Sequence, residues 1–393
     1  MTLHFFRLWA AGSAMLLAAA PVLAENISPD LQFNGFATMG AAWTSGGHSG
    51  EYLNNGLGRT GISNNPSIDY DSVVGLQFTY KANDQVDLVT QLVAKGRTSE
   101  DGSVSPWAMT ADWAYIAYHV TDEATVRAGR FNFNTYMYSD NQRVGQAWPW
   151  ARLPAEVYSA LPLENYDGVE FLYKHAMGDW NLMVQPYAGS HHDNNFTVNR
   201  LLGLNANLSN DNLTLHAGTS QSELDYTLTG LLNLVPPSID PLINVKKNRA
   251  SYSDFGVLYD DGDWFAAAEY SMLRNKGWPV DTNSGYASVG HYFGDWLPYV
   301  LYGRIKTVNN DETLGAFPPP VGSLILPVIS ENQHSVAAGV RYQIRPNTCV
   351  KAQIDRISGF DHTDGLFGHF SDPTGPSQLD TAYLYSLSLN VAF

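Results

Sequence analysis

The feature that most constrains this chain is a repeated pattern of alternating segments joined by connections of two different lengths. The segments run for about ten residues and place apolar or aromatic side chains at every second position. Examples are Trp180-Leu182-Val184, Trp264-Ala266-Ala268-Tyr270 and Val350-Ala352-Ile354. Because a side-chain period of two is the period of a β-strand, the pattern predicts an all-β fold.

Seven connections are tight turns, each containing Gly, Asn, Asp or Pro or a pair of short polar residues, as hairpin turns require. They lie at residues 82–85, 121–123, 176–179, 209–212, 260–263, 294–295 and 345–347. Eight long loops are expected between them, including 45–69, 96–110, 134–166, 221–250, 306–332 and 358–378. Seven turns and eight loops predict sixteen antiparallel strands. Counts of fourteen or eighteen stay open, because the third and twelfth segments alternate poorly.

The last segment alternates to its final residue. Its apolar or aromatic positions are Tyr383, Tyr385, Leu387, Leu389, Val391 and Phe393. An exposed aromatic edge strand promotes aggregation in a soluble sheet, whereas a closed barrel has no edge. The segment resembles the last strand of outer-membrane β-barrels, which typically ends in Phe. The resemblance implies a transmembrane antiparallel β-barrel of about 16 strands, with short periplasmic turns and long extracellular loops.

The N-terminal residues predict export. Arg7 precedes an apolar stretch from Leu8 to Pro21, and small residues lead to Ala24. This order is typical of a secretory signal peptide, and the stretch is shorter than the roughly 20 residues that a membrane-spanning helix needs. We expect residues 1–24 to be a signal peptide cleaved after Ala24, and residues 25–393 to form the outer-membrane barrel domain.

Composition excludes several function classes. The chain has 22 Lys and Arg against 38 Asp and Glu, which opposes nucleic-acid binding. Its 10 Trp, 22 Tyr and 17 Phe suit the aromatic girdles of a barrel. The single Cys349, the isolated His191-His192-Asp193 cluster and the absence of a G-x-S-x-G motif favour no metal site, cofactor or enzymatic activity.

The long segment 134–166 is the expected constriction loop. It follows the strand 125–133, which contains Gly129-Arg130. In position and length the segment resembles the inward-folded third loop of general diffusion porins, although it lacks the acidic Pro-Glu-Phe-Gly-Gly-type tip of some members. The resemblance implies a porin, a water-filled channel for passive diffusion of ions and small hydrophilic solutes. It also implies a homotrimer in the outer membrane, surrounded by lipid and lipopolysaccharide.

The charged residues expected at the constriction come from the loop and from the barrel wall. The loop region carries Asp140, Arg143, Arg152, Glu156, Glu164 and Asp167. Strand parity predicts an inward position for Lys81, Lys174, Arg304, Arg341 and Lys351, and Arg130 is added by the family resemblance. Acids on the loop facing a basic wall would create a transverse field that sets ion selectivity.

Other features leave alternatives open. Trp148 and Trp150 are expected to pack the loop against the wall, rather than to offer stacking surfaces to solutes. The apolar, proline-rich loops 228–245 and 314–330 are expected to fold over the mouth or against a neighbouring subunit. The alternative to a general porin is a substrate-specific channel for sugars or organic anions; an outer-membrane enzyme or adhesin is a third possibility.

Overall fold

The computed structural model describes residues 25–46, 51–53, 61–97, 104–159, 161, 163–192, 196–227, 244–276, 280–315, 319, 323, 326, 329–368 and 380–393. Sixteen long strands form its wall. They are β2 (Leu31–Gly46), β4 (Val73–Asn83), β5 (Val86–Lys95), β6 (Met109–His119), β7 (Ala124–Asn132), β8 (Asn165–Met177), β9 (Trp180–His192), β10 (Phe196–Ser209), β11 (Leu213–Thr227), β12 (Asn244–Asp260), β13 (Trp264–Asn275), β14 (Asp281–His291), β15 (Trp296–Val308), β16 (Gln333–Arg345), β17 (Thr348–Ser358) and β19 (Thr381–Ala392).

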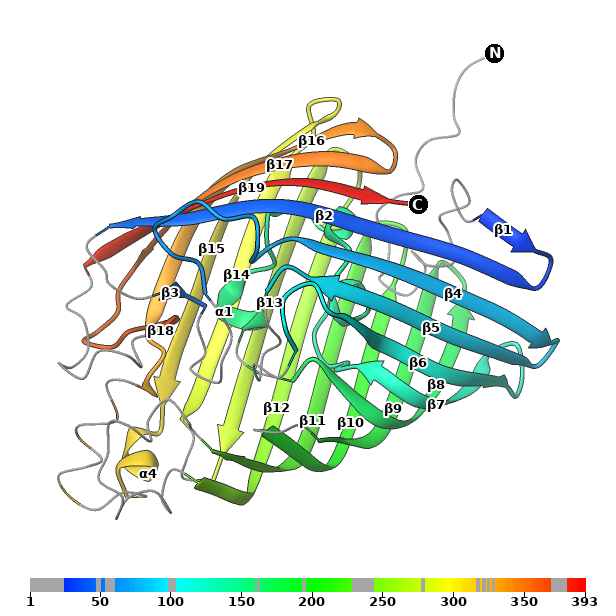
Figure 1. Cartoon of the computed structure of the whole chain (residues 1–393), viewed down its shortest axis with the longest axis horizontal. Coiled ribbons are helices and arrows are strands. Elements are labelled where there is room, and N and C mark those ends of the chain that lie inside the picture. The colour runs from blue at the N-terminus through cyan, green and yellow to red at the C-terminus, as the bar shows by residue number, and fades with distance from the viewer. Residues whose placement is uncertain are drawn as a thin grey trace.

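These strands form a closed antiparallel barrel in which each strand pairs with the next (Figure 1). The last strand, β19, closes the barrel by pairing with β2 from Ala382↔Gly46 to Ala392↔Phe36. Backbone hydrogen bonds between Gly35 and Phe393 extend this seam, at 2.6 and 2.8 Å. The predicted fold class and count of sixteen strands are therefore confirmed.

The connections follow the predicted pattern with two exceptions. All seven predicted tight turns join neighbouring strands, and they define what we call the turn end of the barrel; the opposite end is the loop end. Two of the eight connections at the loop end are short, since only residues 193–195 separate β9 from β10 and residues 276–280 separate β13 from β14. The expectation of eight long loops was wrong at these two places.

The two faces of the wall differ in their surroundings. Predicted outward residues such as Trp264, Tyr270, Val350 and Ile354 are exposed apolar side chains, as a lipid-facing band requires. The inward faces of β13 to β16 are partly apolar. They carry buried apolar side chains that include Phe265, Tyr286, Leu297, Tyr299, Leu301, Ile305 and Ala337, because chain folded into the lumen covers them.

Short elements complete the fold. The segment between β7 and β8 contains the 3-10 turns η1 (Ser139–Asn141) and η2 (Gly145–Ala147) and the single-turn helix α1 (Ala155–Tyr158). β1 (Glu25–Ser28) pairs with β2, and β3 (Glu51–Tyr52) pairs with β18 (Phe367–Gly368) in a separate small sheet. α4 (Asn310–Gly315) follows β15 at the loop end. None of the helices in the described residues is long and apolar enough to cross a membrane.

Candidate functional site

The segment between β7 and β8 enters the barrel and is held there by aromatic packing. Trp150 is fully buried and makes edge-to-face contacts with Tyr138, Phe265 and Tyr286 at ring-centroid distances of 5.3 to 5.8 Å. Its indole Nε1 donates a hydrogen bond to Ser288 Oγ at 2.9 Å. α1 packs against β13, β14 and β15. The predicted packing role of Trp148 and Trp150 is confirmed, since both side chains are buried.

Lys351 anchors the same segment to β17, three strands further along the wall. Its ammonium group is fully buried and donates to the carbonyl oxygens of Gly145, Trp148 and Trp150 at 2.5, 2.7 and 2.8 Å. A Cβ atom at Gly145 would lie 2.0 Å from Asn390 Oδ1, so only glycine allows the segment to approach β19 this closely. The charge of Lys351 therefore binds the loop backbone and is not exposed to the lumen.

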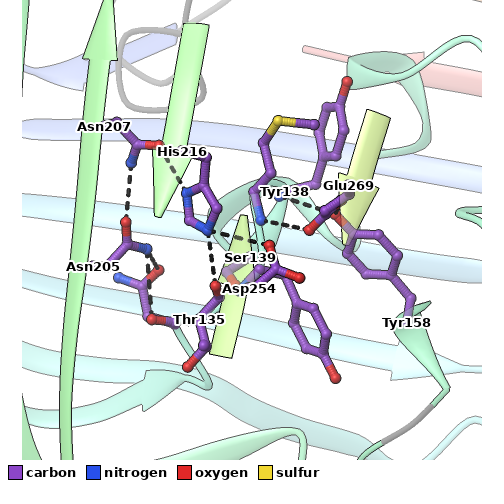
Figure 2. A network of polar contacts seen from close by, with 12 residues as sticks. Thr135, Tyr138, Ser139, Tyr158, Asn205, Asn207, His216, Asp254 and Glu269 are labelled. Atoms are coloured by element: carbon purple, nitrogen blue, oxygen red, sulfur yellow. Dashed lines mark hydrogen bonds and ion pairs between the residues drawn. The ribbon is translucent and has the colours of Figure 1, made fainter. Parts of the chain in front are cut away.

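A network of polar contacts fixes the first half of the segment to β11–β13 (Figure 2). Glu269 accepts hydrogen bonds from the backbone N–H of Met137 at 2.9 Å and from the hydroxyls of Tyr158 and Tyr286 at 2.7 and 2.9 Å. Nearby, His216 Nε2 donates to the carbonyl oxygen of Thr135 at 2.8 Å. One carboxylate of the wall thus holds two separate parts of the inserted segment, near Met137 and at Tyr158.

The same network contains a buried pair of ionisable side chains. His216 Nε2 lies 3.5 Å from Asp254 Oδ1, and both side chains are fully buried. Within the described residues, neither carboxylate oxygen of Asp254 has a hydrogen-bond partner. Because no solute could reach these atoms without displacing the inserted segment, the pair supports the wall and does not line a path.

Ion pairs hold the other side of the segment. Glu164 lies in ion pairs with Lys95, Arg97 and Arg143. Burial alone would raise the pKa of the Glu164 carboxyl, but these three cations outweigh it and hold the pKa well below its usual range. Arg143 also reaches Asp112 at 3.2 Å. The three cations and two carboxylates at this side therefore neutralise one another in part.

Arg152 is neutralised in the same way. Its guanidinium group binds Asp71, the residue that precedes β4 by two positions, through Nε at 2.8 Å and through a second contact from its terminal nitrogen. A bidentate pair of this kind is both strong and directional. The sequence analysis did not predict Asp71, Asp112 or Lys95 as site residues. A local sequence pattern cannot show which wall residue will form an ion pair with a loop residue far away in the chain.

Asp140 is the loop acid that faces a basic wall. It lies in η1, is half-buried, and interacts electrostatically with Arg127 of β7 and Lys174 of β8. Arg127 also pairs with Glu170 and stacks its guanidinium over the rings of Tyr115 and Phe131, at 5.3 and 5.5 Å. Lys174 is exposed. The loop acid and the wall cations thus lie within electrostatic range of one another.

Two predicted inward residues lie on the outer face. Arg130 pairs with Asp167 in register on β7 and β8, and both side chains are about half exposed. They share the parity of Val126 and Val169, which face outward. The inward arginine of this strand is Arg127, which could have been found from the apolar Val126 and Ala128 on either side of it. Arg304 is likewise outward, beside Tyr302. Its predicted inward position was wrong because both faces of β15 are apolar, so parity alone could not distinguish them.

The remaining predicted residues lie away from Asp140. Lys81 is exposed at the turn end, 3.8 Å from Asp84. Glu156 is buried in α1 and accepts a hydrogen bond from Gln333. Arg341 faces inward and donates to Gln343. The loop 228–245 lies almost entirely outside the described residues, as does most of 314–330, of which Leu326 and Ile329 pack against the core.

Comparison with known proteins gives consistent results. The sequence profile of Gram-negative porins matches residues 10–362. Among solved structures, the anion-selective porin of Comamonas acidovorans is similar at 12% identity, with 92% of this chain and 99% of that chain covered and a TM-score of 0.55. OmpF of Salmonella typhi is similar at 14% identity, with 92% and 97% covered and a TM-score of 0.55.

A third similar structure is OmpT of Vibrio cholerae, at 13% identity, with 93% of this chain and 99% of that chain covered and a TM-score of 0.53. At these identities the likeness concerns the fold alone. No functionally curated protein sequence matches the chain.

Proposed function

This chain belongs to the Gram-negative porin family, and on that premise we propose which parts of it narrow the channel and set its selectivity. The family and the closed sixteen-strand barrel make the protein an outer-membrane diffusion channel. A barrel of this size leaves an aqueous lumen unless chain enters it. We propose that residues 134–166 form the constriction and that Asp140, facing Arg127 and Lys174, is its charged centre.

The observation that carries this proposal is that some charged side chains of the lumen have an ion-pair or carbonyl partner and others have none among the described residues. Glu164, Arg143 and Arg152 lie in ion pairs, and Lys351 is buried against carbonyl groups. These groups present little net charge to a passing ion. Asp140 and Lys174 are in no ion pair found among the described residues, and they lie on opposite sides, one on the loop and one on the wall. A low-dielectric wall focuses the field between such groups.

Reversal potentials in a planar bilayer under a salt gradient test the proposal. We expect Asp140→Asn to shift the preference toward anions and Lys174→Gln to shift it toward cations. Asp211→Asn and Lys81→Gln are the matched controls, because they remove the same charges from exposed positions at the turn end. If the Asp140 and Lys174 variants have the same reversal potential as the control variants, the proposed charged centre of the constriction is wrong.

A substrate-specific channel is the second candidate, and one observation favours it. The inserted segment is anchored on several sides, to β13 through Glu269, to β14 through Ser288 and to β17 through Lys351, so the free cross-section is smaller than sixteen strands would allow. Current through a specific channel is blocked by its solute at submillimolar concentration, whereas a general porin shows no saturable block. A titration with neutral sugars and with organic anions separates the two.

Assembly and export remain proposals of the same kind. We propose that the chain loses residues 1–24 to signal peptidase and works as a homotrimer among outer-membrane lipids. N-terminal sequencing of the membrane form should begin at Glu25. Conductance steps in multiples of three, together with a trimeric species after cross-linking, are expected; single independent steps would contradict the trimer. We propose no catalytic role, since the His216–Asp254 pair is inaccessible to solutes.

A further inference from the structure

His216 is the centre of a chain of hydrogen bonds that begins and ends on the inserted segment (Figure 2). Its Nε2 contacts the carbonyl oxygen of Thr135 at 2.8 Å, and its Nδ1 contacts Asn207 Oδ1 at 2.9 Å. Asn207 Nδ2 donates to Asn205 Oδ1 at 3.1 Å. Asn205 Nδ2 in turn donates to Asn134, to its Oδ1 at 2.7 Å and to its carbonyl oxygen at 3.5 Å. These five residues, which we call the entry clamp, hold two consecutive residues of the segment to β10 and β11.

The direction of the hydrogen bonds in the entry clamp determines the protonation of His216. Both ends of the clamp are backbone carbonyl groups, which only accept hydrogen bonds. Each asparagine amide between them offers one donor and one acceptor to its neighbours. Counted from the carbonyl of Asn134, the amides therefore present an oxygen to His216 Nδ1, while the carbonyl of Thr135 requires a proton on Nε2. A histidine that donates at both ring nitrogens is an imidazolium cation.

Acidic groups face His216 from the neighbouring strands and from the segment. Asp254 Oδ1 on β12 lies 3.5 Å from Nε2, and both side chains are fully buried. Glu269 on β13 and Asp140 in η1 also act electrostatically on the ring. Burying a charge is costly unless it is paired, and these acids supply the opposite charge. The other ionisable groups described around this network are tyrosine hydroxyls, which stay neutral up to about pH 10; they belong to Tyr136, Tyr138, Tyr158, Tyr252 and Tyr286.

The segment lies directly on the wall at the entry clamp. A Cβ atom at Gly218 would lie 2.2 Å from the carbonyl oxygen of Thr135, and one at Gly256 would lie 2.8 Å from Met137 Sδ. Gly256 is opposite His216 in register. Thr135 and His216 are both buried. A buried acceptor that loses its donor bears the cost of its lost solvation, so each hydrogen bond of the clamp affects how firmly the segment is held.

We propose that His216 is the positioning residue of the inserted segment and that its cationic form closes the entry clamp. When the ring loses one proton to solvent, it can donate to Thr135 or to Asn207 but not to both. The start of the segment is then held less tightly, and with it the turn η1 that carries Asp140. The inference rests on the proposed function only in that residues 134–166 form the constriction; it does not depend on which charges set the selectivity.

Nitrogen-15 NMR of the refolded, histidine-labelled protein tests the protonation directly. We expect His216 to carry protons on both ring nitrogens at pH 5 and on one of them at pH 9. Its signals are those that are missing from the spectrum of His216→Gln. In Asp254→Asn the second ring proton should be lost at a lower pH than in the wild type, because the opposite charge is gone. A single protonated nitrogen at pH 5, or an unshifted titration in Asp254→Asn, would contradict the proposal.

Hydrogen–deuterium exchange of peptides that cover residues 133–141 measures how firmly the entry clamp holds the segment. His216→Gln offers one donor where the imidazolium offers two and cannot titrate, so it imitates the neutral ring at every pH. At pH 5 we expect exchange in this variant to be roughly two- to tenfold faster than in the wild type, the effect of one hydrogen bond; at pH 9 the two should agree. His175→Gln is the matched control, because it removes an exposed histidine that lies 2.8 Å from Glu123 at the turn end.

The exchange rates decide the inference, and conductance separates it from the proposed function. Equal exchange of His216→Gln and the wild type at pH 5, or the same difference at both pH values, would overturn the inference. Faster exchange at pH 5 together with higher single-channel conductance and noise supports both the clamp and the constriction. Faster exchange with unchanged conductance supports the clamp and counts against residues 134–166 as the constriction. If His216→Gln does not refold, the shift of the ring titration in Asp254→Asn assigns the signals and decides the outcome.

Discussion

A buried ammonium group with three carbonyl partners, as at Lys351, stabilises a loop only while all of its partners are in place. Replacing Lys351 by Met keeps the apolar stem but leaves three buried carbonyl oxygens without their donor. A buried polar group left unpaired costs about 1–3 kcal/mol. We expect Lys351→Met to loosen the inserted segment and to raise single-channel conductance and current noise. Lys81→Met is the control, and a Lys351→Met channel as quiet as the wild type would contradict the anchoring role.

Asp140 predicts a pH-dependent selectivity with a definite sign. Burial raises the pKa of its carboxyl above the ordinary value, although Arg127, Lys174 and His216 act in the opposite direction. A raised pKa means that the negative charge is lost earlier as the pH falls. Glu164 keeps its charge in that range, because its pKa is lowered. Anion preference should therefore grow on acidification of the wild type.

The control for this prediction is Asp140→Asn, which cannot titrate at that position. Its reversal potential should change less between pH 7 and pH 4 than that of the wild type. A pH dependence that is the same in both proteins would assign the titration to other groups.

At the level of single residues, the sequence located the segment but not the contacts within it. Asp140, Arg143, Arg152, Glu156 and Glu164 were found because they lie in one long loop. Their roles as free or neutralised charges depend on Asp71, Lys95 and Asp112, which are far away in the chain. A local pattern carries no information about such partners.

Elements at the loop end are also sensitive to pH. Glu331 lies between α4 and β16, and its backbone N–H donates to Thr307 Oγ1 at 2.8 Å. Burial raises the pKa of its carboxyl from 4.5 to about 7. The unfolded chain ionises first, so the contribution of Glu331 to stability is fully present below about pH 4.5 and is lost as the pH rises to about 7.

Glu331→Gln removes this decline because the amide cannot ionise. We expect the variant to exceed the wild type in unfolding free energy by about 1–3 kcal/mol at pH 8, and to match it at pH 4. Thermal unfolding at the two pH values measures the difference. An equal gain at both values would mean that titration of Glu331 does not contribute.

The elements themselves follow from local rules. Alternation predicted the strands, and turn residues such as Asp260 and Gly262 stabilise the turns: Gly262 N donates to Asp260 Oδ1 at 3.0 Å. Alternation was ambiguous only where both faces of a strand are apolar. On β15, Leu297 and Leu301 face the inserted segment while Val300 and Tyr302 face outward, so Arg304 was assigned to the wrong side.

The whole molecule depends on one seam between its ends. β19 contributes eleven register pairs with β2 and eleven with β17. Deleting residues 381–393 would leave the edges of β2 and β17 unpaired, and an unpaired backbone group in lipid costs several kcal/mol. We expect the truncated chain not to refold into a heat-resistant barrel in detergent, as judged by gel mobility with and without heating.

A milder change tests the same seam. Gly35→Val places side-chain atoms where Phe393 now lies, since even a Cβ would be 2.4 Å from that ring. This variant should refold in reduced yield, whereas Gly315→Ala, at the end of α4 with nothing within 4 Å of the added Cβ, should cost little. For the deletion of residues 381–393, full refolding would show that closure of the barrel by β19 is dispensable.

The sequence by itself determined the class of fold, a count of about sixteen strands and the seven turns, whereas the inward course of the loop 134–166 was implied by the family resemblance. The strands and turns depend on side-chain period and turn chemistry, which act over a few residues. Only the tertiary structure decided which charges of the lumen remain free and which strand faces are covered. Those outcomes depend on contacts between residues more than 100 positions apart, such as Lys351 with Trp148 and Glu269 with Met137. They arise because the inserted segment replaces water as the neighbour of part of the wall.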